Sequence, residues 1–458
     1  MNYFKVSKFF LVLPVLGIVI VTTSTLFPFI VGKYVWFRST VALALIFFCL
    51  GLLFDKIKGK EMWDRISGIF KRPIVIAVTV FVAVFLLAGF FGINPANSFW
   101  SNFERGEGGL QLLNLWMFFM LLVTLFKEKK DWEGILNWAL VGGILMSVYG
   151  FFAAFGAEGF IGAKFSEFGS DFRFQGSIGN PAYVATYAIF MMFYSAYLLV
   201  TKYKNKILSS FGGILTSILT LFFFAVFILA ATRGGFIGLG ASILAMLLYV
   251  GFKHKKWRKK ALIAVIAIII IAFSFVVFRN TPFIKSIPGS RIFDISYTAQ
   301  TFQHRVIMWK VAWDGFKERP LLGWGPENFL RVFDEKFNTD YFKPNEGFGA
   351  WFDRAHNIYF DYLVSAGILG LLSFLSIFII FYISFFRHSK RTEVVKKDEH
   401  TNYHKLIENG LLFGLFFAYL VQGIVLFDVS PIYLNIFLIL ALSVWKFGQG
   451  NKITEKTK

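Results

Sequence analysis

Apolar runs of about twenty residues recur along most of the chain and constrain its fold more than any other feature. A bilayer offers no water to backbone amides and carbonyls, so a crossing segment must satisfy them internally, as a helix of about 20 residues. Twelve runs meet this requirement: 9–31, 37–54, 73–92, 110–126, 132–156, 182–200, 207–231, 234–250, 261–278, 357–386, 407–427 and 431–447. We therefore predict an all-α, polytopic membrane protein of about 12 transmembrane helices.

The composition agrees with this class. Of 458 residues, 57% are hydrophobic and 20% are aromatic, as is typical of membrane proteins. The first run, 9–31, resembles a signal peptide, but it is too long and lacks a small-residue cleavage site, so we expect it to be retained as the first span. The single cysteine, Cys49, excludes an intrachain disulfide and a cysteine-based metal site.

The formal net charge of +20 is by itself compatible with a nucleic-acid partner. The lysines and arginines gather instead in short loops between apolar runs, where positive charge marks the cytoplasmic side of a membrane. With the N-terminus inside, the cytoplasmic segments hold 30 of the 47 basic residues and the short outer segments hold 6, counting Arg38 among the latter. We predict a bacterial inner-membrane protein with both termini in the cytoplasm, and no nucleic-acid partner.

The longest polar segment lies between the ninth and tenth predicted spans, on the outer side. The chain divides into nine spans over 1–278, an extracytoplasmic, mainly helical catalytic segment over 279–356, three spans over 357–447 and a cytoplasmic tail over 448–458. A transporter keeps ionisable side chains within its spans for coupling, and these spans hold almost none. The pattern therefore favours an enzyme at the outer membrane surface over a transporter.

Two of the six histidines, His304 and His356, face the outer side in this topology. His356 stands next to Asn357, where the long segment returns to the membrane. A neutral imidazole there can accept a proton from a sugar hydroxyl. A capping or interfacial histidine is the alternative from position alone.

Two outer arginines are candidates for binding phosphate. Arg233 lies in a short turn between two apolar runs and is followed by two glycines, which allow a ligand or another backbone to come close. Arg305 begins a predicted amphipathic helix with Trp309 on the same face. A pair of arginines binds a diphosphate through planar, bidentate contacts that lysine cannot make. Taken singly, either arginine is as readily structural.

Other outer residues stand in turns before apolar runs. Arg173 and Asn180 belong to a glycine-containing turn whose backbone amides can bind an anion, although an ordinary turn explains it equally well. Arg105 precedes a glycine-rich stretch that is not a phosphate loop, because neither the motif nor a preceding strand is present. The chain also lacks zinc-protease, CxxC and EF-hand spacings. We therefore predict no metal and no other cofactor.

An ordered set of motifs covers roughly residues 90 to 385. It consists of Thr232-Arg233-Gly234-Gly235, Arg305-x-x-x-Trp309, Pro320-x-x-Gly323-x-Gly325 and His356-Asn357. In this order and on this membrane side, the set resembles the O-antigen ligase and O-antigen polymerase superfamily. The earlier stretches around Arg105 and from Arg173 to Asn180 are also similar to that family.

The resemblance implies a glycosyltransferase with its active site on the extracytoplasmic face. Members move a glycan from an undecaprenyl-diphosphate carrier to a lipid, glycan or protein hydroxyl, without metal or nucleotide sugar. Matched by motif, Arg233, Arg305 and His356 are the expected catalytic residues. Expected substrate-binding residues are Arg173, Asn180, Asn357, Trp309 and Arg105, with Arg173 assisting the diphosphate and Asn357 orienting His356. A ligase is the first expectation; a repeat-unit polymerase, a protein O-oligosaccharyltransferase and, from another class, a flippase for lipid-linked glycans are the alternatives.

Overall fold

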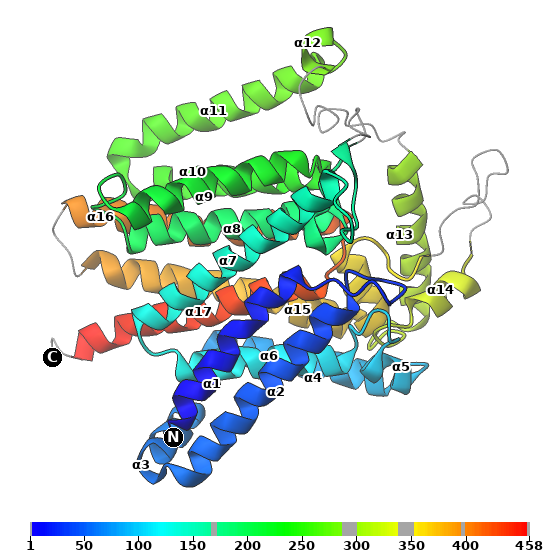
Figure 1. The fold of residues 1–458 in the computed structure, drawn as a ribbon, viewed down its shortest axis with the longest axis horizontal. Coiled ribbons are helices and arrows are strands. Elements are labelled where there is room, and N and C mark those ends of the chain that lie inside the picture. Colours follow the sequence, from blue (N-terminus) through cyan, green and yellow to red (C-terminus); the bar gives the residue numbers. More distant parts are fainter. Residues whose placement is uncertain (1, 166–171, 286–299, 338–351, 395–398, 456–458) are drawn as a thin grey trace.

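The structure, a computed structural model, describes residues 2–165, 172–285, 300–337, 352–394 and 399–455. Every regular element in these ranges is a helix (Figure 1). In order they are α1 Tyr3–Val12, η1 Leu13–Val19, α2 Val31–Phe54, α3 Lys56–Ile69, α4 Pro73–Phe90, α5 Pro95–Trp100, α6 Gly109–Leu125, α7 Lys129–Ala154, η3 Gly176–Ile178, α8 Pro181–Thr201, α9 Phe211–Leu229, α10 Arg233–Lys253, α11 Lys255–Val277, α12 Pro282–Lys285, α13 Gln300–Glu318, α14 Phe329–Glu335, α15 Ile358–Val394, α16 Glu399–Gln422, η6 Gly423–Val425 and α17 Ser430–Glu455.

Ten of the described helices are long and apolar enough to cross a membrane, and α6 is a shorter apolar helix. This confirms the prediction of an all-α, polytopic membrane protein. The first predicted span, 9–31, is not one helix: α1 gives way to the 3-10 helix η1 at Leu13, one residue before Pro14, and the chain becomes extended at Ile20. Proline lacks the backbone N–H that an α-helix needs there, which explains the change of helix type.

The second span begins six residues earlier than predicted, at Val31, so Arg38 lies inside α2 and not in a loop. Its guanidinium Nε donates to Gln111 Oε1 of α6 at 2.9 Å, and its Nη2 donates to the carbonyl of Gly106. A charged side chain satisfied in this way does not end a membrane helix. The partners lie about seventy positions along the chain, so local pattern alone cannot reveal them.

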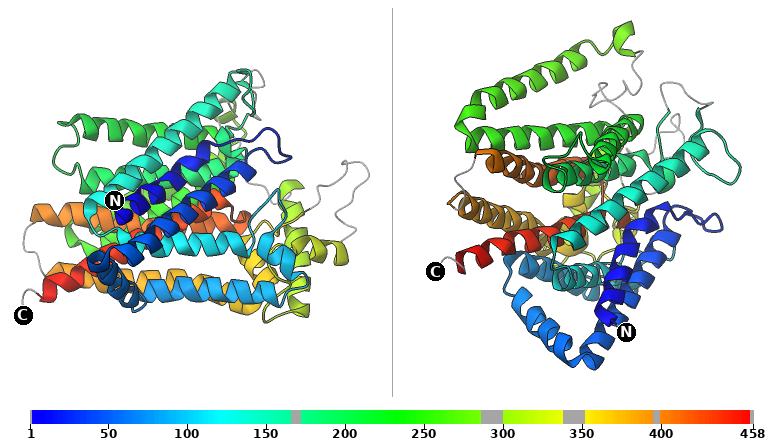
Figure 2. Two further views of the ribbon diagram at one scale, coloured as in Figure 1. Left: turned by 60° about the horizontal axis from the view of Figure 1, so that its bottom comes forward. Right: turned by 60° about the vertical axis from the view of Figure 1, so that its left-hand side comes forward.

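The long helices form one bundle in which neighbours in space are often distant in sequence. α10 packs on α16, α4 on α15, α6 on α17 and α8 on α9. α5, α13 and α14 gather at one end of the bundle, and both termini lie at the other (Figures 1 and 2). α11 packs on α10 at the edge of the bundle, and little of its apolar surface is buried. The bundle thus has a distinct end at which the predicted site residues can meet.

The glycine motif of the long polar segment fastens that segment onto α15. Trp324 N donates to Val364 O and Gly325 N donates to Ser365 O, both at 2.9 Å. Gly323 has a φ of +69°, and a Cβ there would lie 2.5 Å from Val364 O. α15 is broken at Gly367, with φ +66°, to receive this loop. Only glycine allows such an approach of two backbones, which explains why the motif contains these residues.

The described helices of the long segment are α12, α13 and α14, and turns or loops form the described residues between and after them. α13 buries Met308, Val311 and Ala312 against α14 and α15, in a small apolar core of its own. Within the predicted segment 279–356, residues 286–299 and 338–351 lie outside the described residues.

Candidate active site

Three arginines from separate parts of the chain line one cavity of about 140 Å³: Arg173, Arg233 and Arg305. Arg233 is the first residue of α10, so the amide end of a 21-residue helix faces the same space. Arg173 is held in place because its Nη2 donates to Thr232 Oγ1 at 3.1 Å. No acidic residue of the described chain lines this cavity. Guanidinium groups and a helix N-terminus together suit an anion.

Arg305 reaches this cavity from α13 and is largely buried. Burial lowers its pKa, the nearby Tyr183 hydroxyl opposes this, and the like charge of Arg233 lowers the pKa further. Within the described parts of the chain, no carboxylate lies within ion-pair distance of Arg305. The two guanidinium charges repel one another, and two planar forks of this kind suit an anion with several oxygen atoms.

His356 lines a second and larger cavity, of about 510 Å³. Its ring lies between Phe352 and Phe427, with centroid distances of 5.0 and 4.9 Å. Its Nδ1 lies 3.1 Å from the carbonyl oxygen of Arg354. A carbonyl can only accept, so Nδ1 carries the proton in the neutral ring and Nε2 has its lone pair available.

Burial lowers the pKa of His356 to about 4. The Arg354 carbonyl opposes that shift, the charge of Arg305 adds to it, and Asp353 opposes it. The imidazole is therefore neutral near pH 7. It is ready to accept a proton, but it holds one weakly until a negative charge is bound nearby.

The two cavities adjoin. Leu426 lines the arginine cavity and Phe427, the next residue, lines the His356 cavity. At the start of α8, Ala182 lines the first and Asn180 the second. The charge of Arg305 acts on Arg233 and on His356 alike. The structure thus brings the three expected catalytic residues to one site of two compartments.

Of the expected substrate-binding residues, Arg173 lines the arginine cavity, and Arg105 and Asn180 line the His356 cavity. Asn180 also caps α8, because its Oδ1 accepts from Ala182 N at 2.9 Å. Arg105 forms an ion pair with Asp353, with Nε and Nη2 each 2.7 Å from Oδ2. Both side chains therefore line the cavity and also stabilise the structure of its wall.

Asn357 and Trp309 line neither cavity. The side-chain oxygen of Asn357 caps α15, accepting from Tyr359 N at 2.9 Å, and no hydrogen bond in the described structure joins it to His356. The expectation that Asn357 orients His356 through such a bond does not match this geometry. Trp309 stacks on Phe360, with centroids 6.0 Å apart, so it fastens α13 to α15.

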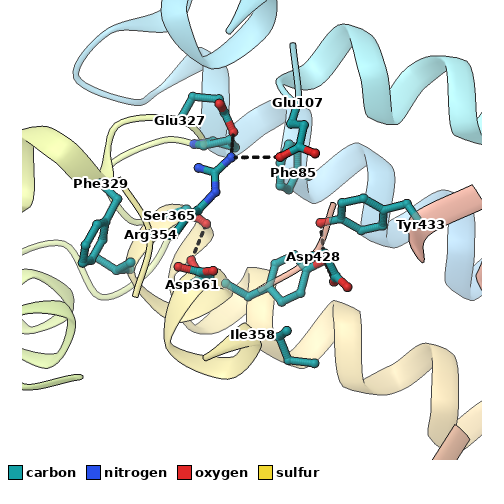
Figure 3. Close-up of a pocket in the computed structure, with 13 residues that line it drawn as sticks. Phe85, Glu107, Glu327, Phe329, Arg354, Ile358, Asp361, Ser365, Asp428 and Tyr433 are labelled. Atoms are coloured by element: carbon teal, nitrogen blue, oxygen red, sulfur yellow. Dashed lines mark hydrogen bonds and ion pairs between the residues drawn. The ribbon is translucent and has the colours of Figure 1, made fainter. Parts of the chain in front are cut away.

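Three charged side chains, Arg354, Glu327 and Glu107, form an ionic frame that holds the loop before His356 (Figure 3). The sequence did not predict this frame. The Arg354 guanidinium is paired with Glu327 and lies 3.6 Å from Glu107 Oε2. Burial alone would lower the pKa of Arg354, but the charges of Glu327 and then Glu107 raise it well above its usual value. A charged residue two positions before His356 was the only local signal. Its partners lie far away in sequence and could not be inferred.

The loop has further attachments beside Arg354. Ala355 N donates to Asp361 Oδ1 at 2.7 Å, and Asp353 is bound to Arg105.

In the part of the chain that the structure describes, no group of three or more His, Cys, Asp or Glu side chains is arranged to hold a metal ion.

Comparison with known families matches residues 215–375 to the sequence model described as O-Antigen ligase. The matched region runs from α9 into α15 and contains Arg233, Arg305 and His356. No curated protein matches the chain. The match supports the family expected from the motifs, and together with the apolar helices it supports a multi-pass bacterial membrane protein.

Proposed function

We propose that this protein transfers a glycan from an undecaprenyl-diphosphate carrier to an acceptor hydroxyl, as an O-antigen ligase, on the outer face of the bacterial inner membrane. The proposal rests on one observation: the region that matches O-antigen ligase carries two arginines that line one cavity, and this cavity adjoins a buried, neutral histidine. The reaction belongs to surface polysaccharide biosynthesis.

The arginine cavity holds the diphosphate of the donor. Arg233 and Arg305 bind its oxygens, and Arg173 and the first amides of α10 assist. Negative charge grows on the diphosphate as the bond from the anomeric carbon to oxygen breaks. Positive groups that are already in place stabilise that charge without rearranging, which lowers the barrier.

The His356 cavity holds the reacting sugar and the acceptor. Nε2 of His356 takes the proton of the acceptor hydroxyl, a role worth roughly 10²–10⁴-fold in rate. Direct displacement then inverts the anomeric centre. Phe352 and Phe427 provide apolar faces for a sugar ring, while Arg105 and Asn180 provide polar groups at the wall. No metal and no other cofactor enters the proposed reaction.

The test is transfer by the purified protein in lipid vesicles supplied with an undecaprenyl-diphosphate glycan and a candidate acceptor. We expect a glycosylated acceptor, with a rate unchanged by EDTA. Movement of the donor across the bilayer without a transfer product would support the flippase instead. Loss of activity in EDTA, restored by a divalent ion, would contradict the metal-independent reaction.

A deletion strain identifies the acceptor class. Loss of a ligase leaves long glycan chains on the carrier, whereas loss of a polymerase leaves single repeat units. Loss of a protein O-oligosaccharyltransferase removes glycans from secreted proteins. Only the first outcome supports the ligase.

A further inference from the structure

Among the carboxyl groups that the structure describes, Glu107 alone lines both the His356 cavity and a neighbouring polar pocket of about 50 Å³. It comes from the turn between α5 and α6 and has no part in the reaction as proposed so far. That pocket also contains the Arg354 guanidinium (Figure 3). Glu107 therefore connects the reaction cavity to the ionic frame behind it.

The backbone holds Glu107 in a fixed position. Its Oε1 accepts from Ser430 N at 2.9 Å. Gly106 has a φ of +60°, and a Cβ there would lie 2.5 Å from the ring of Tyr34. A Cβ on Gly108 would lie 2.7 Å from Phe99 O. The two glycines let the turn pass between its neighbours and direct the carboxyl group inward.

The second carboxyl oxygen is incompletely satisfied. Glu107 is 7% exposed, and its Oε2 accepts no hydrogen bond from any residue that the structure describes. The nearest cation, Arg354 Nη2, is 3.6 Å away. A buried carboxylate oxygen without a hydrogen bond is costly, so its presence at a cavity wall indicates a role with a proton or a ligand.

The surroundings keep Glu107 partly protonated and partly ionised near neutral pH. Burial raises its pKa to about 7, against the charge of Arg354. The charged and titratable groups that act on it come from every neighbouring element: Arg38, Arg105, Tyr183, Glu327, Arg354 and Tyr433. Glu327 raises the pKa of Glu107, while Arg354 and Arg105 lower it. A group of this kind gains and loses a proton readily at pH 7.

We propose that Glu107 is the destination of the proton that His356 removes from the acceptor hydroxyl. The inference rests on the proposed function and extends it. His356 alone is a poor final holder of the proton, because it is buried and the positive charges of Arg305 and Arg105 act on it. Glu107 faces the same cavity and holds a proton more firmly.

The acceptor O–H gives its proton to His356, and the acceptor oxygen forms a bond to the anomeric carbon. The bond from that carbon to the diphosphate breaks, and its electron pair leaves with the diphosphate. The imidazolium then passes its proton to the Glu107 carboxylate through one water or one glycan hydroxyl in the cavity. Glu107 finally releases the proton to water.

The test is the pH dependence of kcat/KM for Glu107→Gln in the reconstituted transfer assay. The wild-type rate should fall as the pH drops below about 7, because protonated Glu107 cannot accept. Glu107→Gln should lower turnover about 10²-fold and remove that acid limb. The donor KM should be unchanged.

Glu327→Gln is the matched control. Glu327 pairs with Arg354 but lines only the small pocket, so its loss weakens the ionic frame without touching the His356 cavity. It should retain the acid limb, shifted below pH 7 because the charge of Glu327 no longer raises the pKa of Glu107. If Glu107→Gln keeps the wild-type rate and limb, or if both variants lose activity equally with the limb in place, the proton role is wrong. His356→Ala separates the two proposals, because full activity there contradicts the proposed function itself.

Discussion

His356 adopts a left-handed backbone conformation, with a φ of +53°, that residues other than glycine seldom adopt. The loop around it makes this possible. Arg354 and Asp353 are held by ion pairs on one side, and Asn357 caps α15 on the other. Strain of this kind persists only where neighbours determine the conformation, and it is common in active sites. The orientation of the imidazole is therefore set by the loop's own contacts.

Replacing the imidazole tests its role directly. His356→Ala should abolish transfer, because no other group takes the first proton, while membrane insertion and binding of the donor diphosphate persist. The measurements are product formation and donor binding by the purified variant. Near-normal transfer would remove His356 from the mechanism.

The arginines can be tested without removing charge. Arg233→Lys and Arg305→Lys should each lower kcat/KM by roughly 10–100-fold, because a charge-assisted hydrogen bond is worth about 1.5–3 kcal/mol and lysine cannot form the fork. Arg331→Lys is the control, since Arg331 is exposed on α14 and, among the described residues, forms its ion pair along its own helix with Glu335. Full activity in both cavity variants would contradict bidentate binding of the diphosphate.

At the scale of elements, α10 has two functions. Its first residue, Arg233, supplies a guanidinium group to the arginine cavity. Its glycines allow close packing against the neighbouring helices. A Cβ on Gly235 would lie 2.9 Å from Ala185 Cβ of α8, and one on Gly238 would lie 2.7 Å from Ala418 O of α16. Small residues allow close helix packing where no hydrophobic effect drives association in lipid. In the structure, the glycines after Arg233 mainly allow other helices to pack closely on α10.

This packing predicts a difference between two glycines of the same helix. Gly238→Ala should destabilise the protein by about 1–3 kcal/mol, because the added methyl group meets a backbone carbonyl. Gly240→Ala should have no such effect, since a Cβ there meets nothing within 4 Å. Thermal unfolding in detergent measures both. Equal stability of the two variants would show that α10 and α16 are less closely packed than described.

At the scale of the whole molecule, the site and the termini lie at opposite ends of the bundle (Figure 2). The distribution of basic residues predicts that the terminal end is cytoplasmic. The site then faces the side to which lipid-carried glycans are delivered. An outer site with both termini in the cytoplasm requires an even number of crossings, a topology that stays a prediction.

The orientation can be tested with single cysteines, after Cys49→Ser removes the natural thiol. Glu158→Cys, in the exposed turn after α7, should react in intact cells with a maleimide that cannot cross the inner membrane. Lys204→Cys, in the exposed turn after α8, should react only after permeabilisation. The reverse pattern would place the site in the cytoplasm and contradict the proposed function.

Much of the fold could be read from the sequence, because a bilayer demands long apolar helices and little else satisfies it. The helical class and most of the spans follow from that single constraint, whereas ten of the described helices, and not twelve, are long and apolar enough to cross a membrane. The exact boundaries of the helices depend on contacts between distant parts of the chain. α2 starts early because Arg38 is satisfied by Gln111 of another helix, and α15 is broken because the loop at Gly323 crosses it. Neither partner is visible in a local window.

The sequence by itself determined the class of the chain, its helices, and the identity of Arg233, Arg305 and His356 as candidates, because apolar length and short motifs are local properties. Only the tertiary structure decided that these residues share a site of two compartments, that Asn357 caps a helix, and that Glu107 and Glu327 surround Arg354. The physical reason is distance along the chain. Glu107 and Arg354 are separated by more than half of the sequence, and only the packing of the bundle brings their charges together.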